Sequence, residues 1–267
     1  MKLKFSDHVS GNLYEIRGKR RVWGEAAFKK TQDNVAEGYC PNCGGKLTEA
    51  DRREESVKYV VVFGEVAVCE RCGWWSVFKT FIDGDHDFAP ITTKVYFSIL
   101  KKYKISDKNP TLEFLDRELK KKPSAIAKMN KTAFEKYMQD ILQEYYGKRV
   151  HHVGRSNDGG VDLLMIEDNE RTLVQVKNRM LHKSEGSLLV RDLMGAMLQK
   201  NTFKGLILST ARHFTVPACR TANEALSHGI VQKIEFKNCN QILEMIDAVS
   251  SNREEPWKPV LKKLWGK

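Results

Sequence analysis

The chain has 267 residues, of which 41% are hydrophobic and 30% are charged, a composition typical of soluble globular proteins. No apolar run approaches the roughly 20 residues that a membrane span requires, and the first residues, MKLKFSDH, lack the apolar stretch of a signal peptide. We therefore expect a cytoplasmic protein without a membrane segment. The length suffices for one large domain or two small ones.

The charge of the chain indicates an anionic partner. Its formal net charge is +11, which makes nucleic acid the first candidate and an acidic membrane surface the second. Residues 91–131 contain eleven Lys and Arg but four Asp and Glu, with dense runs at 101–104 and 120–122. Each run is also compatible with a solvated helix face, so charge alone does not decide the partner.

Four of the six cysteines form two C-x-x-C pairs, each followed by glycine: Cys40 with Cys43, and Cys69 with Cys72. In a chain without a secretion signal, such pairs are more often metal ligands than disulfides. Four thiolates complete a tetrahedral Zn²⁺ shell, and the glycines permit a tight turn around the sulfurs. We expect a structural zinc ion. A redox-active pair of dithiols is the alternative.

The segment from about 38 to 82 resembles a zinc ribbon, because strand-like sequence at 58–68 fills the gap between the cysteine pairs. For Trp74 and Trp75, which follow the second pair, packing over the zinc core is favoured over stacking on a base. We assign residues 1–90 to an N-terminal region that contains this ribbon. A basic helical connector is expected at 91–130.

Beyond residue 111 the pattern becomes helical and then mixed. Leu112, Leu115 and Leu119 follow helical spacing up to Pro123. An α/β domain with a mixed sheet is then predicted over 131–250, followed by a basic C-terminal tail at 251–267. The expected order is helix 132–146, strands 149–153, 161–166 and 171–178, helix 188–200, strand 204–209, helix 217–227, strand 230–236 and helix 240–250.

The strands at 161–166 and 171–177 are expected to form a hairpin. Asp168 and Asn169 are assigned as the two-residue turn, because both residues tolerate the left-handed conformation. With this turn, Glu167 opposes Glu170. A slip by one residue would exchange the two faces of the strand. The sequence therefore predicts one register.

In that register Asp162 opposes Gln175, and Lys177 lies diagonally beside them. Opposed side chains lie about 4.5–5.5 Å apart, so that a carboxylate and an amide oxygen can share one cation. Burying an amide and an ammonium in a strand as apolar as R-T-L-V-Q-V-K costs several kcal/mol unless each finds a partner. We therefore predict a divalent metal ion beside Asp162.

Together these segments resemble the Mrr-like restriction endonucleases of the PD-(D/E)xK nuclease superfamily. The resemblance covers about residues 112–250 and implies a restriction-endonuclease-like αβββαβ core with a mixed sheet. It also implies a Mg²⁺-dependent endodeoxyribonuclease that serves restriction or defence against phage. The matching stretches are F-E at 134–135, D-G-G-V-D at 158–162 and Q-V-K at 175–177, extended by V-R-D-L-M-G-A at 190–196 and K-G-L-I-L-S-T at 204–210.

The resemblance also implies roles for four residues. Asp162 is the central Mg²⁺ ligand, Gln175 occupies the second ligand position, and Glu135 completes the metal shell. Lys177 orients the attacking water and steadies the charge of the transition state. Asp or Glu is commoner than Gln at the second position in the wider superfamily, although Gln is typical of the Mrr branch. The site is thus one negative charge short, which gives Glu135 more weight.

Each of these residues also has a structural interpretation. Thr132 and Glu135 fit a capping box at the start of a helix, and Asp162 fits a turn residue near a strand edge. Gln175 fits a structural amide, and Lys177 fits a side chain that reaches solvent from the end of a strand. We favour the active-site interpretation because the four residues occur in one pattern.

Other polar residues are weaker candidates. His151 and His152 point to opposite faces of a strand, so at most one approaches the site, and a structural role is favoured for both. Arg155 and Arg191 are candidate phosphate contacts. Ser209 lies just after a strand, but no partner residues suggest an assembled nucleophile.

Two other functions remain possible on this evidence. One is a nuclease with a different substrate, such as a Holliday-junction resolvase or a repair nuclease. The other is a DNA-binding protein whose nuclease fold has lost its activity. Because cutting both strands needs two active sites, we expect a homodimer or higher oligomer.

Overall fold

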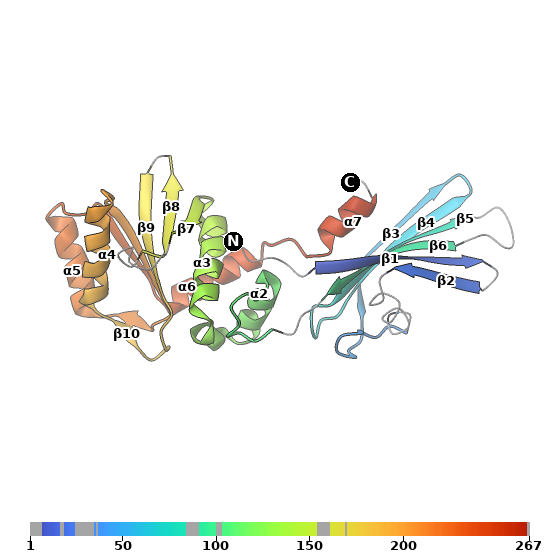
Figure 1. Cartoon of the computed structure of the whole chain (residues 1–267), viewed down its shortest axis with the longest axis horizontal. Helices are drawn as coiled ribbons and strands as arrows, with labels where there is room; N and C mark the ends of the chain where they lie inside the picture. The colour runs from blue at the N-terminus through green and yellow to red at the C-terminus, as the bar shows by residue number, and fades with distance from the viewer. Residues whose placement is uncertain are drawn as a thin grey trace. The chain divides into compact units, whose positions relative to one another are not determined.

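The computed structural model of the chain divides into two compact units (Figure 1). Unit 1 comprises Met1–Lys4 and Tyr103–Arg253, and unit 2 comprises Phe5–Lys102 and Glu254–Lys267. The last segment of the chain, Glu254–Lys267, therefore belongs to unit 2 although it follows unit 1 in the sequence. The structure describes residues 7–16, 19–24, 35, 37–83, 91–99, 103–153, 161–168 and 170–265.

Unit 1 is built on one five-stranded sheet. Its elements are α2 (Leu112–Lys121), the short 3-10 helix η1 (Pro123–Lys128), α3 (Lys131–Tyr146), β7 (Arg149–His152), β8 (Leu163–Glu167), β9 (Glu170–Lys177), β10 (Ser184–Glu185), α4 (Ser187–Gln199), β11 (Lys204–Ser209), β12 (His213–Phe214), α5 (Val216–Ser227), β13 (Lys233–Lys237) and α6 (Cys239–Ser250). The strand order is β13-β11-β9-β8-β7. β9, β11 and β13 are parallel, whereas β8 is antiparallel to both of its neighbours. The predicted mixed sheet is confirmed.

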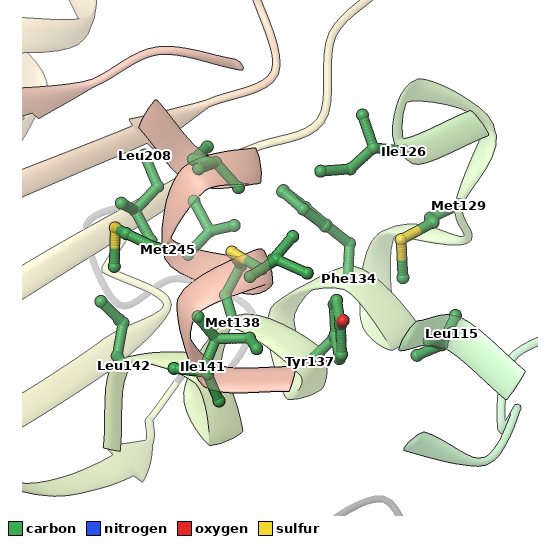
Figure 2. Close-up of a cluster of buried hydrophobic side chains, with 14 of the residues drawn as sticks. Leu115, Ile126, Met129, Phe134, Tyr137, Met138, Ile141, Leu142, Leu208 and Met245 are labelled. Atoms are coloured by element: carbon green, nitrogen blue, oxygen red, sulfur yellow. The ribbon is translucent and has the colours of Figure 1, made fainter. Parts of the chain in front are cut away.

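Helices cover both faces of this sheet (Figure 1). Alternation along β9 places Leu173 in a cluster with residues of α4 and α5, and Val174 in a cluster with residues of α3 and α6. Figure 2 shows part of the second cluster, in which Phe134 of α3, Met245 of α6 and Leu208 of β11 lie together. Both faces of the central strands are therefore buried between helices.

Unit 2 is built on a six-stranded sheet in which all neighbours pair antiparallel. Its order is β2-β1-β6-β5-β4-β3. The segment expected to form a zinc ribbon supplies one half of this larger sheet. The elements are β1 (Asp7–Ile16), β2 (Lys19–Gly24), β3 (Thr48–Val57), β4 (Val60–Val68), β5 (Trp75–Asp83), β6 (Ile91–Ile99) and α7 (Lys258–Trp265).

The stretch 91–130, expected as a connector, is divided between the two units. Its first part is strand β6 of the unit 2 sheet. Its later part, α2, buries Leu112, Leu115 and Leu119 in the core of unit 1. Full burial of a leucine stabilises a fold by about 1.5–3 kcal/mol, which a solvated connector would forgo. The Lys120–Lys122 run is exposed, as a solvated helix face requires.

The expected basic tail at 251–267 is also part of a core, because it contains α7. Trp257 and Leu261 are buried in a cluster with residues of β4 and β5. A Cβ atom on Gly64 of β4 would lie 1.9 Å from the ring of Trp265, so only glycine leaves room for this indole. The helix therefore belongs to unit 2. No helix within the described ranges is long and apolar enough to cross a membrane.

Candidate active site and candidate metal centre

The β8–β9 hairpin has the register that the sequence predicts. Leu163 pairs with Val174, and Glu167 pairs with Glu170. Asp168 has a φ of 42°, the left-handed conformation that a two-residue hairpin turn requires. The turn residues and the two buried faces therefore fix the pairing.

Asp162 lies just before β8, where the strand is irregular. Val161 packs in the cluster of α4 and α5, but Leu163 packs in the cluster of α3 and α6, although residues two apart in a regular strand share a face. The Asp162 N–H donates to the carbonyl of Val174 over 3.0 Å. The regular ladder ends at Leu163, so the expected direct pairing of Asp162 with Gln175 does not form. Such irregularities re-aim side chains and are frequent beside active sites.

The Asp162 carboxylate is buried and contacts β9. Its Oδ2 accepts a 2.8 Å hydrogen bond from the N–H of Val176, the residue between Gln175 and Lys177. Burial raises the pKa of this carboxyl, the Val176 N–H lowers it, Glu135 raises it further and Lys177 lowers it. The charges of Glu135 and Lys177 therefore act on the Asp162 carboxyl. A carboxyl perturbed in this way is a candidate functional group.

Gln175 presents an unsatisfied oxygen inside unit 1. Its side chain is 2% exposed, and its Oε1 has no hydrogen-bond partner among the described residues. A buried acceptor without a partner costs about 1–3 kcal/mol. A cation bound to this amide oxygen would remove that cost. Lys177 is half-buried at the end of the same strand, opposite Ser209 of β11.

Glu135 lies in the first turns of α3 and is buried. The N-cap of this helix is Asn130, whose side chain accepts from the N–H of Thr132. The capping-box interpretation of Glu135 is therefore wrong. Instead, its Oε2 lies 3.1 Å from Nε2 of His152, and its Oε1 lies 3.6 Å from Nζ of Lys131.

His152 is the histidine of β7 that lies near the candidate site. It contacts Glu135, whereas His151 is exposed, which agrees with the prediction that at most one of the two approaches the site. Strand alternation was the available signal, since it turns one of the two toward the helix that precedes the strand. Arg191 is exposed on α4, and Arg155 lies outside the described residues.

A second buried carboxylate holds the loop that follows Lys177. Glu185 is 4% exposed and accepts hydrogen bonds from Oγ of Ser209 over 2.7 Å and from Nε of Arg179 over 3.2 Å. The hydroxyl of Thr210 donates to the carbonyl of Arg179. Ser209 is thus engaged by a carboxylate and is not part of a nucleophile assembled with a histidine. The loop is anchored to β11.

The four paired cysteines converge in unit 2. Their Sγ atoms all lie within 4.8 Å of one another, and the sulfurs of Cys40 and Cys72 are 3.5 Å apart while those of Cys43 and Cys69 are 3.6 Å apart. Two sulfurs bound tetrahedrally at about 2.3 Å from Zn²⁺ would be about 3.8 Å apart. The set therefore fits zinc in ligand type, number and spacing.

The two cysteine turns are built alike. The carbonyl of Cys40 accepts from the N–H of Gly44 over 2.8 Å, and the carbonyl of Cys69 accepts from the N–H of Gly73 over 2.7 Å. Both glycines have positive φ, 69° and 76°, which a residue with a Cβ adopts at a cost. The first turn precedes β3 and the second joins β4 to β5.

Apolar side chains pack against the cysteines. Trp74 is 3% exposed and packs in the cluster that contains the cysteines, with its ring 5.4 Å from that of Phe97, which confirms packing over stacking on a base. Burial raises the pKa of the Cys40 and Cys69 thiols. Both are therefore protonated at neutral pH in the metal-free chain, and a bound cation would displace those protons.

The order of elements, the mixed sheet and the acidic and basic groups at one end of β9 define unit 1 as a restriction-endonuclease-like fold, as the sequence predicted. Residues 126–246 match the family described as restriction endonuclease, Mrr_cat. The match assigns this region, which is less than half of the chain, to an Mrr-like restriction endonuclease domain.

Among solved structures, the chain is similar to the restriction endonuclease FokI. The two share 14% sequence identity with a TM-score of 0.39, and the match covers 62% of this chain and 36% of that one. The chain thus spans little more than a third of the length of FokI. A comparison with curated proteins finds no match.

Proposed function

We propose that the protein is a Mg²⁺-dependent endodeoxyribonuclease whose active site consists of Glu135, Asp162, Gln175 and Lys177. The observation that carries this proposal is the buried, unsatisfied Oε1 of Gln175, two residues before Lys177 and next to the backbone that binds the Asp162 carboxylate. A buried amide oxygen without a partner is a ligand of the type that suits a hard cation. The restriction-endonuclease family match supports the same proposal.

The donor set fits Mg²⁺ in its chemistry. Glu135 and Asp162 would supply carboxylate oxygens and Gln175 an amide oxygen, which leaves room in an octahedral shell for water and substrate. When bound, Mg²⁺ supplies a nucleophile derived from water and neutralises charge on the scissile phosphate. All ligands of this set are oxygen atoms, whereas the cysteine site offers only sulfur.

Lys177 would orient the attacking water and stabilise the negative charge that develops on the phosphate. Its backbone is held in place, because its carbonyl accepts a 3.1 Å hydrogen bond from the N–H of Thr210. Asp162 is held in turn by the N–H of Val176. Groups fixed in this way need little reorganisation when the substrate binds.

The substrate we propose is duplex DNA, cut in restriction or in defence against phage. The net charge of +11 supports an anionic partner, and the name of the family supports restriction. Because two strands require two active sites, the active form would be a homodimer or higher oligomer.

For unit 2 we propose a structural Zn²⁺ ion bound by Cys40, Cys43, Cys69 and Cys72. Four protein sulfurs complete a tetrahedral shell and leave no position for a substrate. The unit would then contact DNA or another protein through its surface, and its zinc would stabilise the fold.

The proposal is tested by incubating the purified full chain with supercoiled plasmid, with and without Mg²⁺. We expect cleavage that requires Mg²⁺ and that falls at least about 100-fold in Lys177→Ala, because this variant loses the proposed active-site cation. Lys233→Ala is the matched control, since this lysine is exposed at the start of β13 and should leave the rate unchanged.

Other results would support different functions. Faster cleavage of four-way junctions than of linear duplex would indicate a resolvase, and DNA binding without cleavage in any divalent metal would indicate an inactive nuclease fold. Cleavage that persists in Lys177→Ala would contradict the proposed site. Comparing methylated with unmethylated plasmid tests the restriction role.

A further inference from the structure

We infer that His152 is a positioning residue that holds one oxygen of Glu135, so that the other oxygen is directed to the metal ion. The inference rests on the proposed function and extends it by one residue. Three observations support it: the contact between His152 and Glu135, the placement of β7 beside Asp162, and the weak contact on the second oxygen of Glu135.

The backbone of His152 is fixed next to the proposed site. His152 is the last residue of β7 and pairs with Leu163, the first residue of β8. The next residue, Val153, donates its N–H to the carbonyl of Asp162 over 3.0 Å. The strand that carries the imidazole is thus hydrogen-bonded to the strand that leads to the central metal ligand.

The hydrogen bond between His152 and Glu135 has one possible direction when the carboxylate is ionised. A carboxylate only accepts, so Nε2 of His152 carries the hydrogen and donates to Oε2 over 3.1 Å. This holds for the charged imidazole and for the neutral tautomer with a hydrogen on Nε2. One oxygen of Glu135 is therefore occupied.

The other oxygen of Glu135 is only weakly engaged. Its contact is Nζ of Lys131 at 3.6 Å, on a side chain that is 73% exposed. At this distance the contact is weak, and the exposed lysine loses side-chain entropy when it holds one position. Oε1 is therefore the oxygen that can exchange its contact for a metal ion, while Oε2 stays on His152.

Orientation of this carboxylate matters more here than in a site with three acids. Gln175 supplies a neutral oxygen, so Glu135 is one of two anionic ligands in the proposed set. Partners that orient metal ligands typically change metal affinity or activity by about 10–100-fold when they are removed. Loss of His152 should therefore weaken metal binding while the ligands themselves remain.

The chain offers a conservative variant and a matched control for the test. The variant His152→Gln replaces the imidazole with an amide whose N–H can donate to Glu135, so it should retain the positioning. His151 neighbours His152 in sequence but is exposed, so His151→Ala controls for removal of an imidazole from the same strand. Both variants are made in the full, zinc-loaded chain.

The experiment measures Mg²⁺ binding by titration calorimetry without DNA, and Mg²⁺ dependence of plasmid cleavage alongside it. We expect His152→Ala to weaken Mg²⁺ binding and to raise the half-saturating Mg²⁺ concentration by about tenfold. His152→Gln should stay within about threefold of the wild type, and His151→Ala should match it. In a Glu135→Gln background the further change His152→Ala should add little, because the two residues act as one unit.

Equal Mg²⁺ binding by His152→Ala and the wild type would overturn the inference. So would a full effect of His152→Ala in the Glu135→Gln background, or slower cleavage at saturating Mg²⁺ with unchanged metal binding, because either result would assign His152 an action independent of Glu135. If the wild type binds no Mg²⁺, the proposed function fails as well. If the wild type binds and cleaves but His152→Ala binds equally, the inference alone fails.

Discussion

The two proposed metal sites differ in how far the protein itself completes them. In unit 2, four sulfurs from two similar turns already lie within 4.8 Å of one another. In unit 1, the proposed ligands come from α3, from the irregular residue before β8 and from β9, and they fill about half of an octahedral shell. A closed shell serves stability, whereas an open shell serves chemistry.

In both sites, burial disfavours the ionised form of some of the proposed ligands when no cation is bound. Burial raises the pKa of Cys40 and Cys69 in one site and of Asp162 in the other. The consequence differs, because Cys40 and Cys69 are themselves buried members of an apolar cluster of unit 2, whereas the two large apolar clusters of unit 1 contain none of its four proposed site residues. Metal loss should therefore unfold unit 2, whereas unit 1 should stay folded and lose its proposed activity.

Zinc removal gives the largest expected effect. Structural zinc contributes about 10–16 kcal/mol in small domains, which is comparable to the whole stability of a domain, so a zinc chelator or Cys69→Ser should unfold unit 2. All five tryptophans belong to unit 2, so their emission should shift to the red while helical circular dichroism, mostly from unit 1, persists. These are Trp23, Trp74, Trp75, Trp257 and Trp265.

Cys219→Ser is the control for this prediction, because Cys219 is half-buried on α5, outside the cysteine cluster. It should retain one zinc per chain and native tryptophan emission. Native emission in a chain shown to be free of zinc would contradict the structural role and remove the contrast between the sites.

The sequence predicted the local features of both sites well. Paired cysteines with following glycines predict two tight turns, and the turn at Asp168 with apolar residues on both faces predicts the β8–β9 register. Each of these patterns lies within a few residues and leaves few alternative conformations. The main helices and strands of unit 1 follow for the same reason, although the two-residue strands β10 and β12 were not predicted.

Features that depend on distant segments could not be predicted in this way. The irregularity at Asp162 is visible only through the opposite packing of Val161 and Leu163. The contact of His152 with Glu135 joins a strand to a helix. Residues 251–267 were expected as a basic tail, but Trp257 and Leu261 are buried against a sheet formed near the other end of the chain.

Gln175→Glu tests the contrast between the two sites, because it gives the proposed site of unit 1 a third carboxylate ligand. A third carboxylate adds charge to the ligand set, and we expect Mg²⁺ binding to tighten by about 10–100-fold, since charge count tunes the affinity of oxygen sites. Titration calorimetry of the zinc-loaded chain measures this directly. Gln175→Met is the comparison, because it keeps the volume but removes the oxygen and should weaken binding. Unchanged affinity in both variants would show that this side chain does not contact the ion.

Asp162→Asn should give the smallest change in free energy, a gain in stability of the metal-free protein. Because burial raises the folded-state pKa of Asp162 above its unfolded value, the favourable contribution is complete below the unfolded pKa of about 4 and is lost as the pH rises through the folded value. At neutral pH the ionised carboxylate therefore destabilises unit 1. Asparagine keeps an oxygen for the Val176 N–H and removes the charge.

We expect Asp162→Asn to raise the free energy of unfolding of unit 1 at pH 7 by about 1 kcal/mol, measured by helical circular dichroism in urea without added Mg²⁺, while plasmid cleavage is lost. The gain should shrink as the pH approaches 4, since wild-type Asp162 then becomes neutral too. Asp192→Asn, on the exposed face of α4, should change neither stability nor cleavage. Lower stability of Asp162→Asn at pH 7 would mean that the carboxylate stabilises the metal-free fold. The open site would then resemble the closed one in serving structure, and the distinction drawn between the two units would be lost.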